Sequence, residues 1–201
     1  MKYSLVEIFE SLQGEGRNTG KQCIFVRFAG CNLKCPWCDT SVAPRFSLSL
    51  DELLAEISTS RSKNIILTGG EPTIVSGMAE LVAALKNSGY WIAVETNGTR
   101  GVDDAPWLEF VDYIATSPKI EEGVEAIRLS AADEVRVVAS QPQVGTVPFC
   151  NALREKVRAN DYYISPCERD GVIDWATAKD TLAKLPDWSL SVQLHKVLGF
   201  R

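Results

Sequence analysis

Residues 64–72 read NIILTGGEP, an apolar run that ends in two glycines, an acidic residue and a proline. Residues 91–98 read WIAVETNG and follow a similar plan. Short continuous apolar runs of this kind indicate strands that are buried on both faces, as in a parallel sheet. The small and polar residues that end each run predict loops at the carboxyl ends of these strands.

Similar segments recur along the chain, and segments with helical spacing lie between them. Because strands alternate with helices, the sequence predicts parallel strands joined by right-handed crossovers. The expected strands are Tyr3–Phe9, Cys23–Phe28, Asn64–Thr68, Tyr90–Glu95, Val111–Ala115, Glu134–Ala139, Tyr162–Ser165 and Ser189–Leu194.

The helical segments carry signals for their ends. Ser49 is followed three residues later by Glu52, and this pair forms a capping box before the run LLAEI. Gly89 is placed to end the helix before it, since glycine tolerates the left-handed backbone of a C-terminal cap. The expected helices are one that begins after Ser49, and residues 77–87, 148–158 and roughly 174–185.

Length and composition limit the class of protein. The chain has 201 residues, 45% hydrophobic and 23% charged, and is expected to form one globular domain over residues 1–201. It has no internal repeat and no linker rich in Gly, Ser or Pro. We therefore expect an α/β fold with mostly parallel strands, an incomplete version of a larger βα barrel.

Net charge and targeting signals indicate which partners and which cell compartment to expect. The net charge of −5 argues against a general nucleic-acid-binding surface. Lys2, Glu7 and Glu10 interrupt the region where a signal peptide needs an apolar run, and no segment reaches the ~20 apolar residues of a membrane span. We expect a cytoplasmic protein with no membrane partner and reduced thiols. Its six cysteines are then expected to be ligands or buried side chains rather than disulfides.

The most distinctive loops all follow expected strands. In α/β folds of this kind, ligand chemistry gathers at the carboxyl ends of the strands. We therefore expect these loops to converge on one rim of the sheet. They read CNLKCPWCDT (residues 31–40), TGGEP (68–72), ETNGT (95–99) and TSPK (116–119).

The first of these loops carries Cys31, Cys35 and Cys38 at the spacing CxxxCxxC. Three thiolates from one loop can hold three irons of a 4Fe–4S cluster and leave the fourth iron open to another ligand. A structural zinc site would need a fourth cysteine or histidine, and the other three cysteines and His195 have no partner at ligand spacing. A zinc protein and a non-catalytic iron–sulfur protein remain the alternatives.

This spacing, with the aromatic Trp37 before the third cysteine, resembles the signature of the radical S-adenosylmethionine (radical SAM) superfamily. The resemblance implies a partial TIM-like βα barrel of the radical SAM type, whose open iron binds S-adenosylmethionine. Reductive cleavage of that cofactor yields a radical that abstracts hydrogen from the substrate, so the hard chemistry belongs to the cofactor. The implied roles are cluster binding and cofactor cleavage for Cys31, Cys35 and Cys38, and cofactor binding for Trp37, Cys38, Asp39, Gly70, Ser117, Pro118 and Lys119.

Three longer stretches resemble the 7-carboxy-7-deazaguanine synthase family: IFESLQGEGRNTG (8–20), VRFAGCNLKCPWCDT (26–40) and LHKVLGFR (194–201). Members of that family convert 6-carboxy-5,6,7,8-tetrahydropterin to 7-carboxy-7-deazaguanine with loss of ammonia, in queuosine and 7-deazapurine biosynthesis, and require Mg²⁺. The resemblance implies substrate binding by Leu12, Gln13, Gly14, Arg27 and Thr68, and a magnesium ligand in Thr40.

These assignments are chemically reasonable. Backbone groups at residues 12–14 can read the flat donor and acceptor edge of a pterin. The guanidinium of Arg27 matches a substrate carboxylate, although a structural ion pair is the alternative for a strand arginine. Magnesium keeps several waters and takes few protein ligands, so the hydroxyl of Thr40 together with substrate oxygens is sufficient.

The resemblance also implies a reducing electron donor such as flavodoxin or ferredoxin, and a homodimer. A glycyl-radical-enzyme activase shares CxxxCxxC and GGEP, but the segment SLQGEG argues against it. Glu95 is a candidate contact to the cofactor's ribose. Arg136, in EVRVV, either faces inward as a buried cation or faces solvent, and it receives no role. His195 is either a surface or packing residue or a substrate contact, and it also receives no role. The remaining cysteines, Cys23, Cys150 and Cys167, are expected to be core thiols or thiols behind the site.

Overall fold

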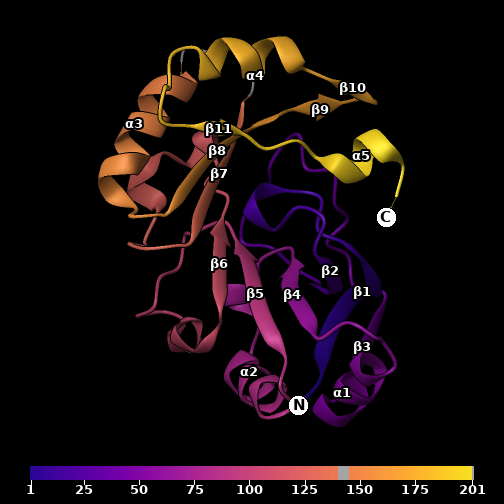
Figure 1. The fold of residues 1–201 in the computed structure, drawn as a ribbon. Helices are drawn as coiled ribbons and strands as arrows, with labels where there is room; N and C mark the ends of the chain where they lie inside the picture. Colours follow the sequence, from indigo (N-terminus) through magenta and orange to yellow (C-terminus); the bar gives the residue numbers. More distant parts are fainter. Residues whose placement is uncertain (140–144, 201) are drawn as a thin grey trace.

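The computed structural model describes residues 1–139 and 145–200. Its centre is a sheet in the order β11-β8-β7-β6-β5-β4-β2-β1-β3 (Figure 1). A separate short hairpin pairs β9 with β10. The strands are β1 (Tyr3–Leu12), β2 (Gln22–Phe28), β3 (Phe46–Leu48), β4 (Asn64–Gly69), β5 (Trp91–Thr96), β6 (Tyr113–Thr116), β7 (Glu134–Ala139), β8 (Asp161–Pro166), β9 (Glu168–Arg169), β10 (Val172–Ile173) and β11 (Ser189–Leu190).

The expectation of mostly parallel strands is confirmed. From β2 through β4, β5, β6, β7 and β8 to β11, every neighbouring pair is parallel. Only β1 runs the other way, antiparallel to β2 and to β3. Within the described residues β3 and β11 form the two edges of the sheet and do not pair with each other, so the barrel is open. This is the incomplete βα barrel that the sequence predicts.

The helices agree with the sequence signals. Ser49 caps α1 through the expected capping box with Glu52, and Asp174 caps α4 by accepting a hydrogen bond from the backbone N–H of Thr177. Gly89 follows α2 with a φ of +76°, as expected of a helix-ending glycine. The helices are α1 (Leu50–Ser58), α2 (Met78–Asn87), α3 (Thr146–Lys156), α4 (Trp175–Leu182) and α5 (Leu194–Leu198).

The expected strand Ser189–Leu194 is wrong beyond its first two residues. The strand β11 ends at Leu190, and α5 begins at Leu194. The backbone N–H of Ser191 still donates to Ile164 of β8, but that of Leu194 donates to Gly14, 2.9 Å away. The segment therefore leaves the sheet after Ser191, and Leu194 finds its backbone partner on the loop after β1.

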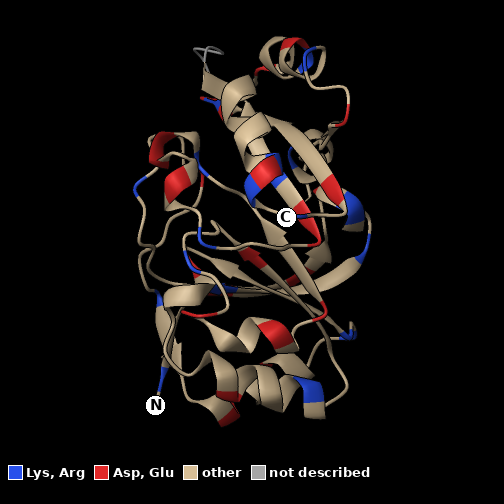
Figure 2. Ribbon diagram, turned by 90° about the vertical axis from the view of Figure 1, so that its left-hand side faces the viewer, with Lys and Arg blue, Asp and Glu red and all other residues tan. Residues whose placement is uncertain are grey.

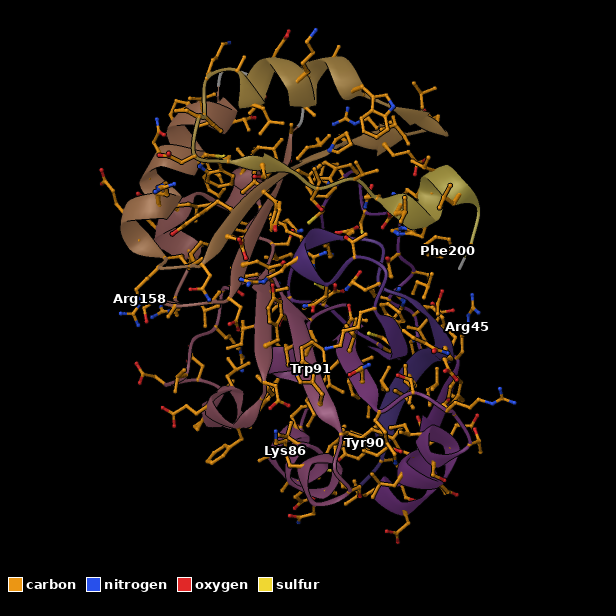
Figure 3. The ribbon with its side chains drawn as sticks, in the orientation of Figure 1. Arg45, Lys86, Tyr90, Trp91, Arg158 and Phe200 are labelled. Atoms are coloured by element: carbon orange, nitrogen blue, oxygen red, sulfur yellow. The ribbon has the colours of Figure 1, made fainter. Side chains whose placement is uncertain are left out.

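Different elements pack against the two faces of the sheet. On the outer face, α1 and α2 pack their apolar sides against β2, β4 and β5, and α3 and α4 pack against β7 and β8. The inner face holds a smaller cluster around Phe25, Ile66 and Ala93, bordered by Trp91 (labelled in Figure 3). Side chains alternate along a strand, so the residues two positions after Phe25, Ile66 and Ala93 also face inward. These residues lie at the carboxyl end of the sheet.

No described helix is long and apolar enough to cross a membrane. Lysine and arginine are interspersed with aspartate and glutamate along the ribbon (Figure 2). Figure 1 shows the C-terminal segment, in yellow, passing from the β11 edge toward α5, beside the N-terminal half of the chain.

Candidate active site

The cysteine loop begins directly after β2. Cys31 and Cys35 are half-buried and Cys38 is exposed, and all three are free thiols. Burial raises the pKa of the Cys35 thiol, and the nearby ammonium of Lys119 acts against that rise, while Cys31 and Cys38 reinforce it. The three sulfurs and Lys119 therefore lie within electrostatic reach of one another.

The donor set on the cysteine loop consists of three thiols. Among the described residues, no three His, Cys, Asp or Glu side chains are grouped closely enough to hold one metal ion. In a 4Fe–4S cluster each thiolate binds a different iron, so its cysteines need not converge on one point. Three thiols on one short loop suit such a cluster.

The TGGEP turn packs directly against the cysteine loop. The backbone N–H of Gly70 donates to the carbonyl of Phe28, and that of Glu71 donates to the carbonyl of Gly30, both at 3.0 Å. A Cβ on Gly70 would come within 1.8 Å of the Gly30 oxygen. Glycine is required here because the two loops touch through their backbones, whether or not a ligand also approaches.

Glu71 braces the next loop along the sheet. Its carboxylate is fully buried and accepts hydrogen bonds from the backbone and hydroxyl of Thr73, the hydroxyl of Thr96 and the backbone of Asn97. The Asn97 side chain then donates to Asn32 of the cysteine loop at 2.9 Å. The ETNGT loop is thus tied both to TGGEP and to the cysteine loop.

The TSPK loop completes the rim. The ammonium of Lys119 donates to the hydroxyl of Ser117 at 2.8 Å and lies 5.1 Å from the centre of the Trp37 ring. The Trp37 ring nitrogen donates to Glu121, just beyond this loop. The expected convergence of the four loops on one rim is confirmed, and it brings Trp37, Gly70 and Lys119 to the same end of the sheet as the cysteines.

Arg27 and Thr68 share the inner face of the sheet. They are register partners on β2 and β4, and Arg27 is opposite Glu7 on β1. The Arg27 Nε donates to Glu7 Oε1 at 2.9 Å, and both side chains are 21% exposed. Thr68 donates its hydroxyl to Glu95 at 2.9 Å. The ion-pair alternative for Arg27 is therefore present in this structure.

Several backbone hydrogen-bonding groups of residues 12–14 are already paired within the chain. The N–H of Gln13 donates to Lys21, its carbonyl accepts from Gly20, and the carbonyl of Gly14 accepts from Leu194. The side chain of Gln13 is buried and donates to Glu95 at 3.0 Å, whereas Leu12 is exposed. A ligand read by these backbone groups would have to share them with the contacts within the chain.

A buried guanidinium organises the middle of the inner face. Arg136 donates to Glu15 at 2.5 Å and to Glu95 at 2.7 Å, and its Nε forms a 3.1 Å ion pair with Glu134. Burial would raise the pKa of Glu95, but the charge of Arg136, with hydrogen bonds from Arg136, Thr68 and Gln13, lowers it to about 2. Three carboxylates thus surround one cation whose side chain is only 5% exposed.

Asp39 and Thr40 lie where the cysteine loop meets the C-terminal tail. Thr40 is half-buried, and its hydroxyl donates to Asp39 at 3.2 Å. The ammonium of Lys196, on α5, contacts Asp39 at 2.5 Å and Glu168 at 2.9 Å. Burial alone would lower the pKa of Lys196, but these two carboxylates raise it above its ordinary value.

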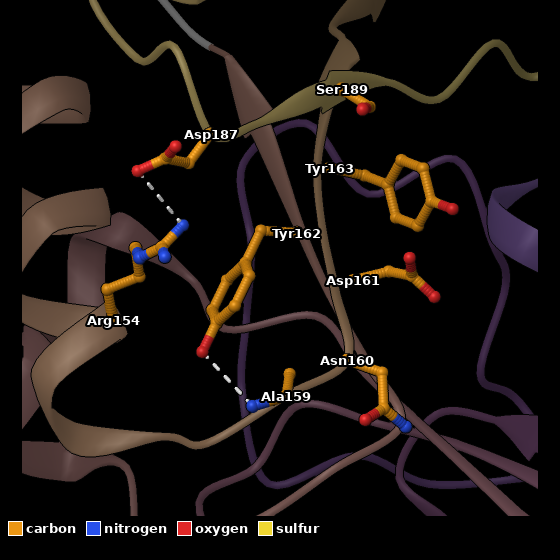
Figure 4. Close-up of a pocket in the computed structure, with 8 residues that line it drawn as sticks. All are labelled: Arg154, Ala159, Asn160, Asp161, Tyr162, Tyr163, Asp187 and Ser189. Atoms are coloured by element: carbon orange, nitrogen blue, oxygen red, sulfur yellow. Dashed lines mark hydrogen bonds and ion pairs between the residues drawn. The ribbon is translucent and has the colours of Figure 1, made fainter.

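A cavity of about 280 Å³ lies away from this rim (Figure 4). It opens at the amino ends of β8 and β11, beside Asp161 and Ser189. An Arg154–Asp187 ion pair closes one side of it. Because chemistry in such folds gathers at the carboxyl ends of the strands, this cavity is not part of the candidate site.

The sequence did not assign roles to several residues of the inner face and the C-terminal tail. Glu15 lies inside the SLQGEG segment. The feature that could have pointed to it is an acidic residue between two glycines. Of the two alternatives for Arg136, the structure has the buried cation, which needs charged partners. Nothing in the local sequence pairs Lys196 with Asp39 or Glu168. Cys23, Cys150 and Cys167 are buried, as expected.

Comparisons with known proteins agree with this arrangement. The chain matches the family model described as Radical SAM superfamily over residues 25–130. It is 42% identical to the 7-carboxy-7-deazaguanine synthase of Haemophilus influenzae, over 98% of this chain and 93% of that protein. It is 44% identical to the enzyme of the same name from Neisseria meningitidis serogroup B, over 98% of this chain and 94% of that protein.

A solved structure supports the fold. The crystal structure of QueE from Escherichia coli has a TM-score of 0.76 to this chain, with 24% identity over 97% of this chain and 95% of that one. The first two relatives match this chain over nearly its whole length, and not only in one shared motif. The chain therefore belongs to the 7-carboxy-7-deazaguanine synthase family of the radical SAM superfamily.

Proposed function

We propose that this protein is a 7-carboxy-7-deazaguanine synthase, a radical SAM lyase that converts 6-carboxy-5,6,7,8-tetrahydropterin to 7-carboxy-7-deazaguanine and expels ammonia. The product would enter queuosine and other 7-deazapurine biosynthesis. The observation that carries the proposal is the rim itself, where three free thiols meet the TGGEP and TSPK loops above an inner face of charged side chains. Relatives of this name match nearly the whole chain.

Each part of the rim has a proposed task. The thiols Cys31, Cys35 and Cys38 would hold a 4Fe–4S cluster, which supplies the electron that cleaves S-adenosylmethionine. The loops beside them would hold that cofactor through Trp37, Cys38, Asp39, Gly70, Ser117, Pro118 and Lys119. Leu12, Gln13, Gly14, Arg27 and Thr68 would then hold the pterin with its reacting carbon toward the cofactor, because hydrogen abstraction depends on close positioning.

The remaining expectations are part of the same proposal. Residues 1–201 would act as one domain, in the cytoplasm, as a homodimer. A low-potential electron donor such as flavodoxin or ferredoxin would reduce the cluster. The substrate would be a small pterin, with neither nucleic acid nor membrane as a partner.

The test of function is an anaerobic assay of the cluster-reconstituted protein with S-adenosylmethionine, a reductant and the carboxytetrahydropterin. The product is scored by its mass, and 5′-deoxyadenosine is measured in the same sample. We expect both products to form. A protein that cleaves the cofactor but leaves the pterin unchanged would contradict the proposed substrate, and a protein that never cleaves the cofactor would contradict the reaction class.

Replacing Arg27 by alanine is expected to weaken binding of the pterin by ~2–5 kcal/mol, the usual cost of breaking a desolvated charge pair. Binding of S-adenosylmethionine should change little. Affinities for the two ligands are measured separately on the reconstituted protein by calorimetry.

Glu7→Gln is the matched control for this prediction, because Glu7 is the partner that holds Arg27 in this structure. Removing that competing carboxylate should leave pterin binding intact or strengthen it. Equal weakening of both ligands in Arg27→Ala would show instead that Arg27 serves the fold.

Thr40 is the proposed ligand of Mg²⁺. Hard oxygen donors fit this ion, and the loop offers the Thr40 hydroxyl next to the Asp39 carboxylate, whereas thiolates do not attract magnesium. Thr40→Val keeps the side chain's shape without its hydroxyl. We expect this variant to lose most of the magnesium dependence of turnover, while the visible absorption of the cluster and the melting temperature stay nearly unchanged.

Thr40→Ser is the conservative control and should respond to magnesium much as the natural chain does. Magnesium is titrated into each metal-depleted protein, and turnover and pterin affinity are followed. A normal magnesium response in Thr40→Val would place the metal on other ligands.

A further inference from the structure

The C-terminal tail joins two loops that lie on different sides of the site. Residues 191–195 contact the loop at 13–16: the Gly16 N–H donates to the Ser191 hydroxyl at 2.9 Å, and the Gln193 amide donates to Glu15 at 2.7 Å. His195 lies against Gly14, where a Cβ would come within 2.3 Å of its ring. The next residue, Lys196, turns to a different partner.

Lys196 contacts the cysteine loop and β9 at the same time. Its ammonium lies 2.5 Å from Asp39 Oδ2 and 2.9 Å from Glu168 Oε2. The Lys196 side chain is 17% exposed, although that of Asp39 is 53% exposed. The lysine is therefore held between its two acids rather than extended into water.

Through these contacts the C-terminal tail reaches both the substrate side and the cofactor side of the proposed site. The loop at 13–16 is on the proposed substrate side, and Asp39 directly follows the cluster ligand Cys38 on the proposed cofactor side. A displacement of about 1 Å between the reacting groups can reduce a rate roughly a hundredfold. Holding these two loops together should therefore affect the reaction rate more than the free energy of unfolding. An ion pair with an exposed partner stabilises a fold only slightly.

We propose that Lys196 is a positioning residue, which ties the C-terminal tail to the cysteine loop and so fixes the pterin-binding loop relative to the bound S-adenosylmethionine. This inference rests on the proposed function for its reaction, but the tie itself can be measured without turnover.

The first experiment measures coupling in Lys196→Met, Lys196→Arg and the natural chain, each with a reconstituted cluster. Coupling is the amount of pterin product formed per 5′-deoxyadenosine released. We expect coupling to fall about tenfold in Lys196→Met, a smaller loss than a full 1 Å error would cause. Lys196→Arg, which keeps the charge and the reach, should retain most of it. Melting temperatures should agree within a few degrees.

Two further variants serve as matched controls. Lys184→Met removes an exposed lysine just after α4 and should keep full coupling. Glu168→Gln breaks only the β9 half of the contact and should keep most of the coupling, because the bond to Asp39 remains.

The second experiment is hydrogen–deuterium exchange on the same proteins without substrate. In Lys196→Met we expect faster exchange in residues 12–16 and in 36–40 together. Faster exchange limited to 194–198, unchanged coupling, or a loss of coupling that comes only with a large drop in melting temperature would each overturn the proposal. If the natural chain formed no pterin product, the proposed function would fail, and exchange in the two loops would still decide whether the tie exists.

Discussion

Replacing Cys35 by alanine is expected to abolish cleavage of S-adenosylmethionine, because a 4Fe–4S cluster held by only two thiolates should be labile. Iron content and visible absorption should fall with it after anaerobic reconstitution. The expectation follows from the donor set, since Cys31, Cys35 and Cys38 are the three thiols that one loop brings to the rim. Released 5′-deoxyadenosine is the direct measure of activity.

Cys150→Ala is the control for this result. Cys150 is buried on α3 in the cluster that packs against β7 and β8, remote in the sheet order from β2 and its loop. Its loss should slightly weaken the fold and leave iron content and cofactor cleavage unchanged. Full cofactor cleavage by reconstituted Cys35→Ala would refute the assignment of the cluster to this loop.

The strands and the rim were predictable because their signals are local. NIILTGG and WIAVETNG are apolar runs ended by turn residues, and β4 and β5 form where these runs lie. Parallel strands place their carboxyl ends together, so the loops that follow them had to meet. The spacing of the three cysteines is likewise a property of ten consecutive residues.

The contacts of the inner face and of the C-terminal tail were not predictable in the same way, because they join residues far apart in the chain. Arg136 meets Glu15 across 121 residues, and Lys196 meets Asp39 across 157. The alternation of SLSVQL is that of a strand, yet only Ser189–Leu190 joins the sheet. Beyond Leu190 the Leu194 N–H and the side chains of Ser191 and Gln193 bond to the loop at 13–16. This outcome depends on the folded neighbour and not on local propensity.

Arg136→Met is expected to cost ~3–5 kcal/mol of folding free energy, because it leaves buried carboxylates without their cation. For a chain of this size, each kcal/mol lowers the melting temperature by ~2–4 °C, so the transition should fall by roughly 6–20 °C. Arg154→Met, which breaks the exposed pair with Asp187, should cost only ~0–1 kcal/mol. Adding Glu134→Gln to Arg136→Met should recover part of the loss, since one unpaired charge is removed.

The pH dependence of this loss separates electrostatics from packing. In the natural chain the pKa of Glu95 is lowered to about 2, so its stabilising contribution is present above the ordinary value near 4.5 and is lost as pH falls toward 2. Without Arg136, burial should instead raise the pKa of Glu95, and the neutral carboxyl then favours folding at low pH. The stability of Arg136→Met should therefore fall as pH rises from about 4 to 7, and its deficit relative to the natural chain should grow. Thermal unfolding followed by circular dichroism across that range measures both slopes. A deficit that stayed constant with pH would mean that Arg136 stabilises the fold by packing alone.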